Sequence, residues 1–385
     1  MKEDIKVNLD NFNYKSLFRI WRYTSTKIGR VSKLYIIIKS IIRLIFLKIK
    51  FIETENKQLK IVNSYPRNDY SNFIDKLTFN NNLGKCYLKY TFGFGHKWAY
   101  IKEVIKQRKL HKLELNETLL LYFLIKNNNI FLKYIYDEPV VILFAEMQIF
   151  ENYIAQLAKQ VGRYTIGLQH GFYSNDFNRN TVNSLNYKNV AVDEMLVWGK
   201  NTKDLLLEHN LDLKVTIVGR PSTHFLSKHD FHLKNDLPSS YVGILDAEEF
   251  SETNNKIIKI ANELADKARV KLFIKCHPST NLKDRNLQSL ILEDINCLGK
   301  TPHFVGYRSS LLLELVADHF FCIALNESPF LKNNSKPNSN SFYWKKLEKE
   351  DVSDYLYCTS IDAQTNILNA ISKRNISTNQ NNPSN

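Results

Sequence analysis

The stretch "PVVILFAEMQIFENYIAQLAKQVGRYTIGLQHG", residues 139–171, determines the expected fold. Residues 139–146 contain a continuous apolar run, as in a strand that is covered on both faces. Residues 148–162 have the apolar periodicity of a helix that ends at Gly162. Residues 163–169 read as a second strand. A strand, a helix and a strand in this order predict a parallel sheet with helices on its faces.

The same alternation extends in both directions along the chain. Around this stretch we expect strands at 59–65, 86–92, 194–199 and 215–219 and helices at 97–110 and 201–210. A second block carries expected strands at 241–246, 270–275 and 320–325 and helices at 252–268, 284–295 and 308–318. With 385 residues, the chain exceeds one ordinary core, so two α/β domains are expected.

The expected division of the chain follows from its breaks in composition. Gly219, Pro221 and Pro238 interrupt the alternation and mark a linker. We expect an N-terminal segment, an N-terminal Rossmann-like domain, a linker, a C-terminal Rossmann-like domain and a polar, disordered tail, at residues 1–58, 59–220, 221–240, 241–375 and 376–385. Two such domains typically hold a ligand in the cleft between them.

The positive charge of the chain is concentrated near its N-terminus. Residues 1–60 hold 14 Lys and Arg and 5 Asp and Glu, and therefore +9 of the net charge of +14. Within residues 33–53, Lys39, Arg43 and Lys50 interrupt an apolar run and fall on one side of a helical wheel. This pattern predicts a basic amphipathic helix on an anionic membrane surface. An N-terminal core helix with snorkelling lysines is an equal alternative.

The polar residue types exclude several classes of site. No motif of a nucleic-acid-binding domain accompanies the positive charge, so no nucleic-acid partner is expected. Five cysteines without C-x-x-C spacing argue against disulfides and a zinc knuckle, and for a reducing compartment. No D-x-D sequence or His/Asp/Glu cluster has metal-ligand spacing, so we expect no metal and no cofactor.

Gln169, His170 and Gly171 follow the strand of residues 163–169. Histidine exchanges its proton near neutral pH, and a glycine beside it allows close approach of backbone or ligand. An isolated His-Gly pair more often caps a helix or lies at the rim of a core. Because sites collect at the carboxyl ends of parallel strands, we expect His170 to be functional.

The segment "KCHPST", residues 275–280, follows the expected strand 270–275 in the same way. Here His277, fixed in place by Pro278, can donate hydrogen bonds to a phosphate. The alternative is a turn in which His277 only caps backbone.

The segment "GYRSSLLLE", residues 306–314, follows another strand end. Ser309 and Ser310 begin a helix whose N–H groups suit a nucleotide phosphate, and Arg308 supplies positive charge there. Glu314, about one turn later, can accept hydrogen bonds from ribose hydroxyls. The alternatives are a plain helix N-cap and a solvated glutamate.

The segment "FGFGH", residues 92–96, is a glycine-rich turn that lacks the dinucleotide and P-loop patterns. Gly95 and His96 could form a backbone cradle for an acceptor. A simple tight turn explains the sequence equally well.

Five short motifs, "GLQHG", "VWGK", "VGRP", "IKCHP" and "RSSLLLE", resemble in this order the GT-B superfamily of nucleotide-dependent transferases. The closest resemblance is to bacterial enzymes of surface-polysaccharide synthesis. The first motif is similar to that of teichoic-acid CDP-glycerol and CDP-ribitol transferases. The K-x-H-P element is similar to that of bacterial sialyl- and polysialyltransferases. The resemblance covers roughly residues 139–325.

The resemblance implies a GT-B fold, with two Rossmann-like domains facing a central cleft. It implies a donor nucleotide in the C-terminal domain, held by His277, Pro278, Arg308, Ser309, Ser310 and Glu314. It also implies His170 as the general base, with the acceptor near Gly95, His96, Gln169 and Gly171. His96 and Glu146 are the next candidates for the base.

The expected activity is a metal-independent transfer of a sugar from a nucleotide sugar to a hydroxyl of a glycan or lipid-linked acceptor. It would serve bacterial capsule, O-antigen or lipo-oligosaccharide synthesis at the cytoplasmic face of the inner membrane. The acidic-acidic-Gly motif of sialyltransferases is absent, and Gln169 stands where the teichoic-acid enzymes carry tryptophan. A CDP-polyol phosphotransferase and a non-catalytic glycan-binding module therefore remain alternatives. The acidic pair of a sugar-nucleotide epimerase is absent.

Overall fold

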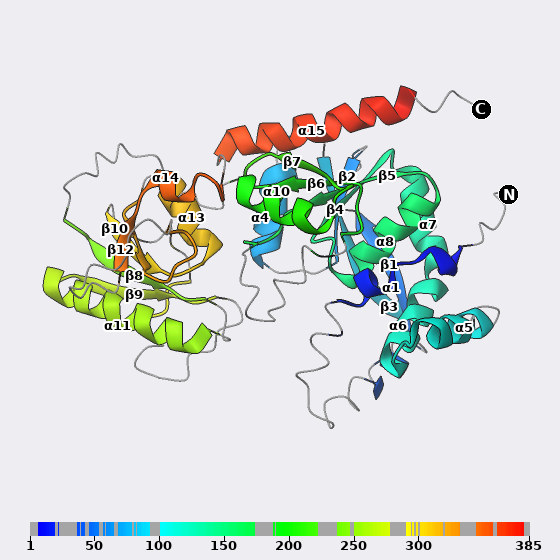
Figure 1. The fold of residues 1–385 in the computed structure, drawn as a ribbon, viewed down its shortest axis with the longest axis horizontal. Coiled ribbons are helices and arrows are strands. Elements are labelled where there is room, and N and C mark those ends of the chain that lie inside the picture. Colours follow the sequence, from blue (N-terminus) through cyan, green and yellow to red (C-terminus); the bar gives the residue numbers. More distant parts are fainter. Residues whose placement is uncertain are drawn as a thin grey trace. The chain divides into compact units, whose positions relative to one another are not determined.

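The computed structural model is drawn in Figure 1, where the residues that it does not describe are grey. It describes residues 7–19, 22, 37–38, 40–42, 46–53, 57, 59–64, 68–78, 81, 83–92, 101–173, 188, 190–221, 237–246, 250–277, 290–293, 295, 298, 301–318, 320–331, 344–356 and 360–380. Most of the expected linker, residues 222–236, lies outside these residues.

The chain forms two compact α/β units, each built around its own sheet (Figure 1). Unit 1 consists of Met1–Val197, Lys203–Thr216 and Thr365–Asn385, and unit 2 of Trp198–Thr202 and Ile217–Gln364. The prediction of two α/β blocks is thus confirmed. The chain passes between the units more than once, whereas the sequence suggested a single linker.

The sheet of unit 1 has seven strands within the described residues, in the order β1-β3-β2-β4-β5-β6-β7. Five neighbours, β3, β2, β4, β5 and β6, run parallel, and β1 pairs antiparallel with β3. The strands are β1 (Leu47–Glu53), β2 (Leu59–Asn63), β3 (Leu83–Phe92), β4 (Val140–Phe144), β5 (Tyr164–Leu168), β6 (Glu194–Val197) and β7 (Lys214–Ile217). Every residue of β4 is buried, as its apolar sequence predicts.

In the part of the chain that the structure describes, six helices connect these strands: α4 (Asn68–Thr78), α5 (Ile101–His111), α6 (Leu115–Lys126), α7 (Asn128–Asp137), α8 (Ile149–Gln160) and α10 (Lys200–His209). The short helices η1 (Leu9–Asn11) and α1 (Tyr14–Leu17) precede β1, and most of α15 (Ser360–Gln380) returns to unit 1 from unit 2. The helix α8 ends before Gly162, whose φ of 71° lies in the left-handed region that glycine adopts without strain. The expected β4-α8-β5 unit is therefore confirmed.

Residues 47–53 form the strand β1, so the expectation of one helix over residues 33–53 is wrong for this part. The reason is a period of two. Ile49 is buried and Phe51 stacks on Tyr134 at 4.7 Å, whereas Lys48 and Lys50 face outward. Residues 37–38, 40–42 and 46 are helical. A helical wheel places Lys50 beside Lys39 and Arg43, but residues 47–53 pair with β3 along their whole length.

The first residues of the chain belong to the core of unit 1. The side chains of Phe12, Leu17 and Phe18 are buried, and Phe12 packs on Tyr153 of α8 with ring centroids 5.1 Å apart. The side chain of Asn13 caps α1 by accepting a hydrogen bond from the N–H of Ser16 at 3.0 Å. Residues 7–19 of the expected N-terminal segment are therefore part of unit 1.

The sheet of unit 2 has five strands within the described residues, in the order β12-β11-β10-β8-β9. All pairs are parallel except β11 with β12. The elements are β8 (Ser240–Ile244), α11 (Ser251–Ala268), β9 (Lys271–Lys275), β10 (Pro302–Gly306), α13 (Ser310–Ala317), β11 (Cys322–Leu325), β12 (Trp344–Leu347) and α14 (Lys349–Val352). Ile257, Ile260 and Ala261 of α11 are buried in this core, as their helical spacing predicts.

Two expectations for the second half of the chain differ from the structure. The expected helix 284–295 is wrong at Ile291, which forms a parallel bridge with Ile274. The helix α15 continues to Gln380, through half of the tail that was expected to be disordered. Buried Ile367 and Ile371 stabilise α15 against unit 1, and Arg374 pairs with Glu194 of β6 at 2.8 Å.

None of the helices in the described parts of the chain is long and apolar enough to cross a membrane.

We expect Phe18→Ala to destabilise unit 1 by about 3–5 kcal/mol, because the ring is fully buried and its removal leaves a cavity. The matched control is Ile42→Ala in the same N-terminal segment, where the side chain is exposed and a change within about 0.5 kcal/mol is expected. Urea unfolding measures both variants. Equal stability of Phe18→Ala and wild type would show that residues 7–19 are not part of the core.

Candidate functional site

The carboxyl ends of the parallel strands of unit 1 lie along one edge of its sheet. Ser64 follows β2, Glu146 follows β4 within two residues, and His170 follows β5 within two residues. The strands β2, β4 and β5 are consecutive neighbours in the sheet. Parallel pairing therefore gathers these three polar side chains at one edge.

His170 lies among aromatic rings. Its imidazole makes edge contacts with Tyr70 of α4, with Phe144 of β4 and with Tyr173, at centroid distances of 5.8, 6.4 and 5.7 Å. Tyr70, Phe144 and Tyr173 are themselves buried. The rings restrict the orientation of an imidazole that is itself only partly buried.

The hydroxyl of Tyr173 lies 3.4 Å from Nδ1 of His170. Burial, followed by the charge of Glu146, raises the pKa of Tyr173, so its phenol stays neutral. In the tautomer that carries its proton on Nδ1, this N–H donates to the phenol and the basic lone pair belongs to Nε2. The arrangement suits an imidazole that accepts a proton at Nε2. Tyr173 was not among the residues singled out from the sequence.

Gln169 and Gly171 shape the turn around His170. Gln169 is buried; its Nε2 donates to the carbonyl of Gly171 at 2.8 Å, and its backbone N–H donates to Leu196 at 3.0 Å. A Cβ at Gly171 would meet no described atom within 4 Å. Gln169 therefore fixes the turn. Its expected contact with an acceptor, like that of Gly171, stays a prediction, and Gly95 and His96 lie outside the described residues.

Glu146 is held in a buried ion pair. Its Oε1 accepts from the guanidinium of Arg19 at 2.7 Å, and its Oε2 accepts from the N–H of Ala191 at 3.3 Å. The preceding Ala145 has φ of 60°, a strained value for a residue with a Cβ. Both carboxylate oxygens of Glu146 are engaged by donors within the fold, and the side chain is buried. The structure thus argues against Glu146 as an alternative base, and the partner, Arg19, is too distant in sequence to have been foreseen.

A second buried carboxyl group at this edge is that of Glu151, on α8. It accepts hydrogen bonds at 2.5 Å from both the backbone N–H and the hydroxyl of Ser64. Burial raises the pKa of Glu151 to about 7, against the effect of these two donors. Sequence reasoning missed this group because Glu151 lies within a helix rather than at a strand end.

The corresponding edge of unit 2 carries Asp246 after β8 and Arg308 after β10, which are neighbouring strands. The backbone N–H of Arg308 donates to Oδ2 of Asp246 at 3.4 Å. Asn254 of α11 accepts from the N–H of Asp246 at 2.8 Å and donates to its carbonyl at 3.0 Å. Burial raises the pKa of Asp246 to about 7, and the charge of Arg308 opposes this shift. Asp246 ends a strand that the sequence indicated, but was not singled out.

Ser309 is the N-cap of α13, and its side chain accepts from the N–H of Leu311 at 3.3 Å. The plain capping alternative is therefore correct for its oxygen, while the hydroxyl hydrogen can still be donated. Ser310 begins the helix and is partly buried. The guanidinium of Arg308 lies 4.3 Å from the ring of Phe250. A helix N-terminus, two hydroxyl groups and a guanidinium thus follow β10 within four residues.

Glu314 is buried, and its carboxylate pairs with Arg220. The guanidinium of Arg220 also lies over the ring of Trp198 at 4.5 Å. The alternative of a solvated glutamate is therefore wrong. The ion pair joins three of the sequence motifs, "VWGK", "VGRP" and "RSSLLLE". A contact of Glu314 with ribose stays a prediction, and Arg220 is the residue that orients its carboxylate.

The remaining motif residues are placed as follows. Gly199 of "VWGK" is required by packing, because a Cβ there would lie 2.5 Å from the backbone of Tyr355. His277 follows β9 and is partly buried. The strand β8 lies between β9 and β10, so His277 and Ser309 follow strands that are not neighbours in the sheet. Pro278 lies outside the described residues.

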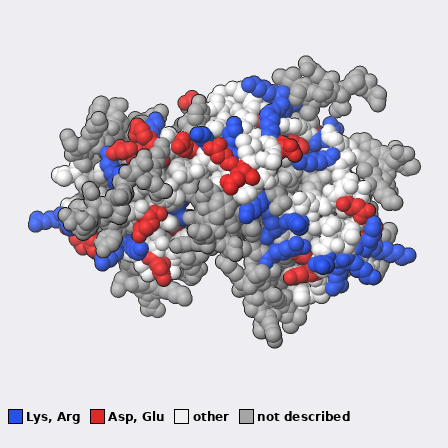
Figure 2. All heavy atoms as spheres, viewed as in Figure 1, with Lys and Arg blue, Asp and Glu red and all other residues white. Residues whose placement is uncertain are grey.

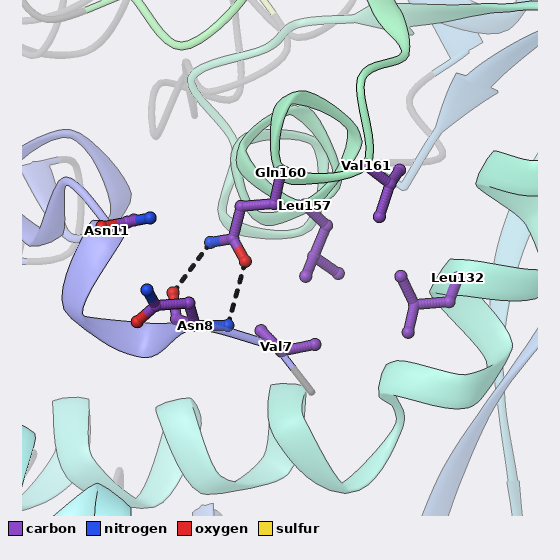
Figure 3. A pocket seen from close by; sticks show the side chains of 7 residues that line it. All are labelled: Val7, Asn8, Asn11, Leu132, Leu157, Gln160 and Val161. Carbon is purple, nitrogen blue, oxygen red and sulfur yellow. Dashed lines mark hydrogen bonds between the residues drawn. The ribbon is translucent and has the colours of Figure 1, made fainter. Parts of the chain in front are cut away.

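A cavity of about 160 Å³ in unit 1 is separate from these residues (Figure 3). It lies between η1, α7 and the last turn of α8, where the amide of Gln160 bonds both backbone groups of Asn8 at 3.1 and 2.9 Å. Since α8 begins near the carboxyl edge of β4 and runs back along the sheet, this cavity lies at the opposite edge from His170. We interpret this cavity as a packing gap where the N-terminal segment lies against α7 and α8.

Comparison with known proteins gives little beyond this geometry. No protein-family model matches the chain, and no curated protein matches it. A solved structure described as "Crystal structure of GtfA/B complex" aligns with a TM-score of 0.33 and 12% sequence identity. The alignment covers 70% of this chain and 57% of the other, so the chain spans less than two thirds of that protein's length. The function must therefore be argued from the chain's own residues.

We expect Asp246→Asn to gain stability relative to wild type as the pH rises. The folded protein keeps the Asp246 proton up to about pH 7, whereas an unfolded aspartate loses it near pH 4. Wild type therefore loses stability between these values, by up to about 4 kcal/mol, and an amide removes that loss. Unfolding in urea at about pH 5 and about pH 8 measures the change. The control is Asp266→Asn on the exposed side of α11. A pH-independent difference for Asp246→Asn would contradict a buried, neutral carboxyl group.

Proposed function

We propose that the protein is a GT-B-type transferase that moves a sugar from a nucleotide sugar to a hydroxyl group of a glycan or lipid-linked acceptor. The observation that carries this proposal is the set of groups at the carboxyl edge of each unit's own sheet. In unit 1, His170 follows β5 and is surrounded by aromatic rings. In unit 2, the N-terminus of α13, capped by Ser309, lies beside Arg308. A proton acceptor and an anion site are the two parts that a metal-independent transfer requires.

The donor half of the proposal rests on α13. The partial positive charge at its N-terminus, the hydroxyls of Ser309 and Ser310 and the guanidinium of Arg308 favour a phosphate group. The same groups would stabilise the negative charge that the nucleotide leaving group gains as its bond to the sugar breaks. We further propose that Glu314, oriented by Arg220, and His277 with Pro278 contact the rest of the nucleotide.

The acceptor half rests on His170. The acceptor hydroxyl loses its proton to Nε2 as its oxygen forms the new bond to the sugar carbon, and the bond from that carbon to the nucleotide breaks. Tyr173 beside Nδ1 supports the imidazolium that results, because its phenol oxygen can accept a hydrogen bond from the Nδ1–H group. Gln169, Gly171, Gly95 and His96 are proposed to lie near the acceptor.

A biological setting is proposed with the activity. The sequence motifs favour surface-polysaccharide synthesis, such as capsule, O-antigen or lipo-oligosaccharide, at the cytoplasmic face of the inner membrane. The alternative, a CDP-polyol phosphotransferase, would use the same base and anion site, but the acceptor oxygen would attack phosphorus instead of the sugar carbon. A glycan-binding module without catalysis would need neither the anion site nor the base, and it would bind no nucleotide.

We expect the double variant Ser309→Ala, Ser310→Ala to bind nucleoside diphosphates at least about 10- to 100-fold more weakly, because a single charge-assisted hydrogen bond contributes about 1.5–3 kcal/mol. The fold should survive, since a lost N-cap costs only about 1 kcal/mol. A thermal-shift panel of CMP, CDP, UDP, GDP and their sugars first identifies the nucleotide. Ser353→Ala, at an exposed position in unit 2, is the control. Unchanged affinity in the folded double variant would remove α13 from the site.

We expect His170→Ala to keep nucleotide affinity but to lose about 10²–10⁴-fold in turnover at saturating donor, the usual scale of general-base loss. His170→Gln should fail equally, because an amide cannot take the proton. Tyr173→Phe should lose less turnover than His170→Ala and should change the pH dependence of kcat. It removes the hydroxyl beside Nδ1 of His170 but keeps the aromatic rings around the imidazole. His209→Ala, on the exposed end of α10, is the control. Near-normal turnover of His170→Ala would assign this histidine a structural role.

A further inference from the structure

The helix α5 (Ile101–His111) attaches to unit 1 by a narrow stripe. Val104 and Gln107 are buried, and the ring of His111 lies 4.4 Å from that of Tyr14. Gln107 donates to Asp10 at 2.5 Å, and the neighbouring Lys106 pairs with Asp10 at 2.9 Å. These contacts fix one side of α5 and leave its opposite side to the solvent.

The solvent side of α5 is basic. Lys102, Arg108, Lys109 and the following Lys112 are all exposed. Of the cations in this stretch, only Lys106 has an acidic partner among the described residues. The one acidic residue of the helix, Glu103, is engaged with Gln107 at 2.7 Å. The four remaining cations therefore have no carboxylate in the described chain to neutralise them.

Aliphatic side chains are exposed between these cations. Ile105 is 46% exposed and Leu110 is 62% exposed, and Leu115 at the start of α6 is 44% exposed. Ile105 lies three residues after Lys102 and four before Lys109, so it neighbours both cations on the helix surface. A single exposed aliphatic side chain needs no explanation, but three of them among these cations make a surface that is both basic and apolar. We call residues 102, 105, 108–110, 112 and 115 the α5 surface.

Unit 1 carries further positive charge that has no acidic partner among the described residues. In the β1–β3 pair, Lys50 lies directly opposite Lys89, and both are exposed. Like charges directly opposite each other destabilise strand pairing, so the positive charge of the β1–β3 pair has a cost in stability. Figure 2 shows Lys and Arg atoms gathered over α5 and α6, with fewer acidic atoms. Together these charges contribute to a positive potential on unit 1.

We propose that the α5 surface docks on a bilayer that contains anionic lipids. Each Lys or Arg near such a surface adds to the attraction, and aliphatic side chains enter the boundary between headgroups and acyl chains. Nucleic acid would match the charge but not the isoleucine and leucines, because its bases stack on aromatic or guanidinium groups. The docking surface is thus a folded helix face, distinct from the segment 33–53 that the sequence suggested.

This inference deepens the proposed function by giving a lipid-linked acceptor a surface beside unit 1, and its test needs no turnover. Full-length protein is sedimented with vesicles of phosphatidylcholine alone or with about 30% phosphatidylglycerol, at about 0.1 M salt. We expect binding only to the anionic vesicles. Lys102→Glu with Lys109→Glu should weaken it at least about tenfold. Ile105→Ser with Leu110→Ser should weaken it about fivefold with the charge unchanged.

The matched control is Lys259→Glu with Lys267→Glu, which makes the same change in net charge on the exposed side of α11 in unit 2. This variant should bind vesicles as wild type does, and circular dichroism checks the folding of all variants. Equal loss in the control would overturn the proposal, because the attraction would then follow net charge alone. Absent vesicle binding, or binding to a single-stranded oligonucleotide that the α5 variants lose, would overturn it as well. Nucleotide affinity that persists in the α5 variants separates this outcome from a failure of the proposed function.

Discussion

Parallel strand pairing is the constraint on which both units depend. In a parallel sheet each strand must be followed by a crossover, so all carboxyl ends share one edge and all helices begin there. In unit 1 this brings Ser64, Glu146 and His170 to the ends of neighbouring strands. In unit 2 it brings Asp246 beside the residues that open α13. The backbone N–H groups that helices leave unpaired at this edge are what makes it suitable for anions.

Buried ion pairs hold the edges in place over long stretches of sequence. Arg19 reaches Glu146 across 127 residues and thereby ties the N-terminal segment to the end of β4. Arg220 reaches Glu314 in unit 2 and stacks on Trp198. Removing one member of such a pair leaves an uncompensated buried charge, which is more costly than the pair itself is stabilising. These pairs therefore specify one arrangement of distant segments.

The repeating elements could be read from the sequence because their signals are local. The apolar run of β4, the periodicity of α8 and the stop at Gly162 each depend on residues close together. The strand β1 was misread because Lys50 falls on the same side of a helical wheel as Lys39 and Arg43, whereas its pairing with β3 carries no local signal. Asp246 was overlooked although it ends an indicated strand, since its burial depends on packing against Arg308 and Asn254. Partners such as Arg220 carry no local signal.

The central claim is that the carboxyl edge of unit 2 binds the phosphates of a nucleotide through the first turn of α13. Hydrogen–deuterium exchange of the full chain, with and without a saturating nucleoside diphosphate, tests it most directly. We expect slower exchange at the backbone amides of residues 308–312 and near Asp246, because bound phosphate oxygens occupy the N–H groups at a helix start. Protection that is absent from these amides, with nucleotide demonstrably bound, would contradict the account and place the nucleotide elsewhere.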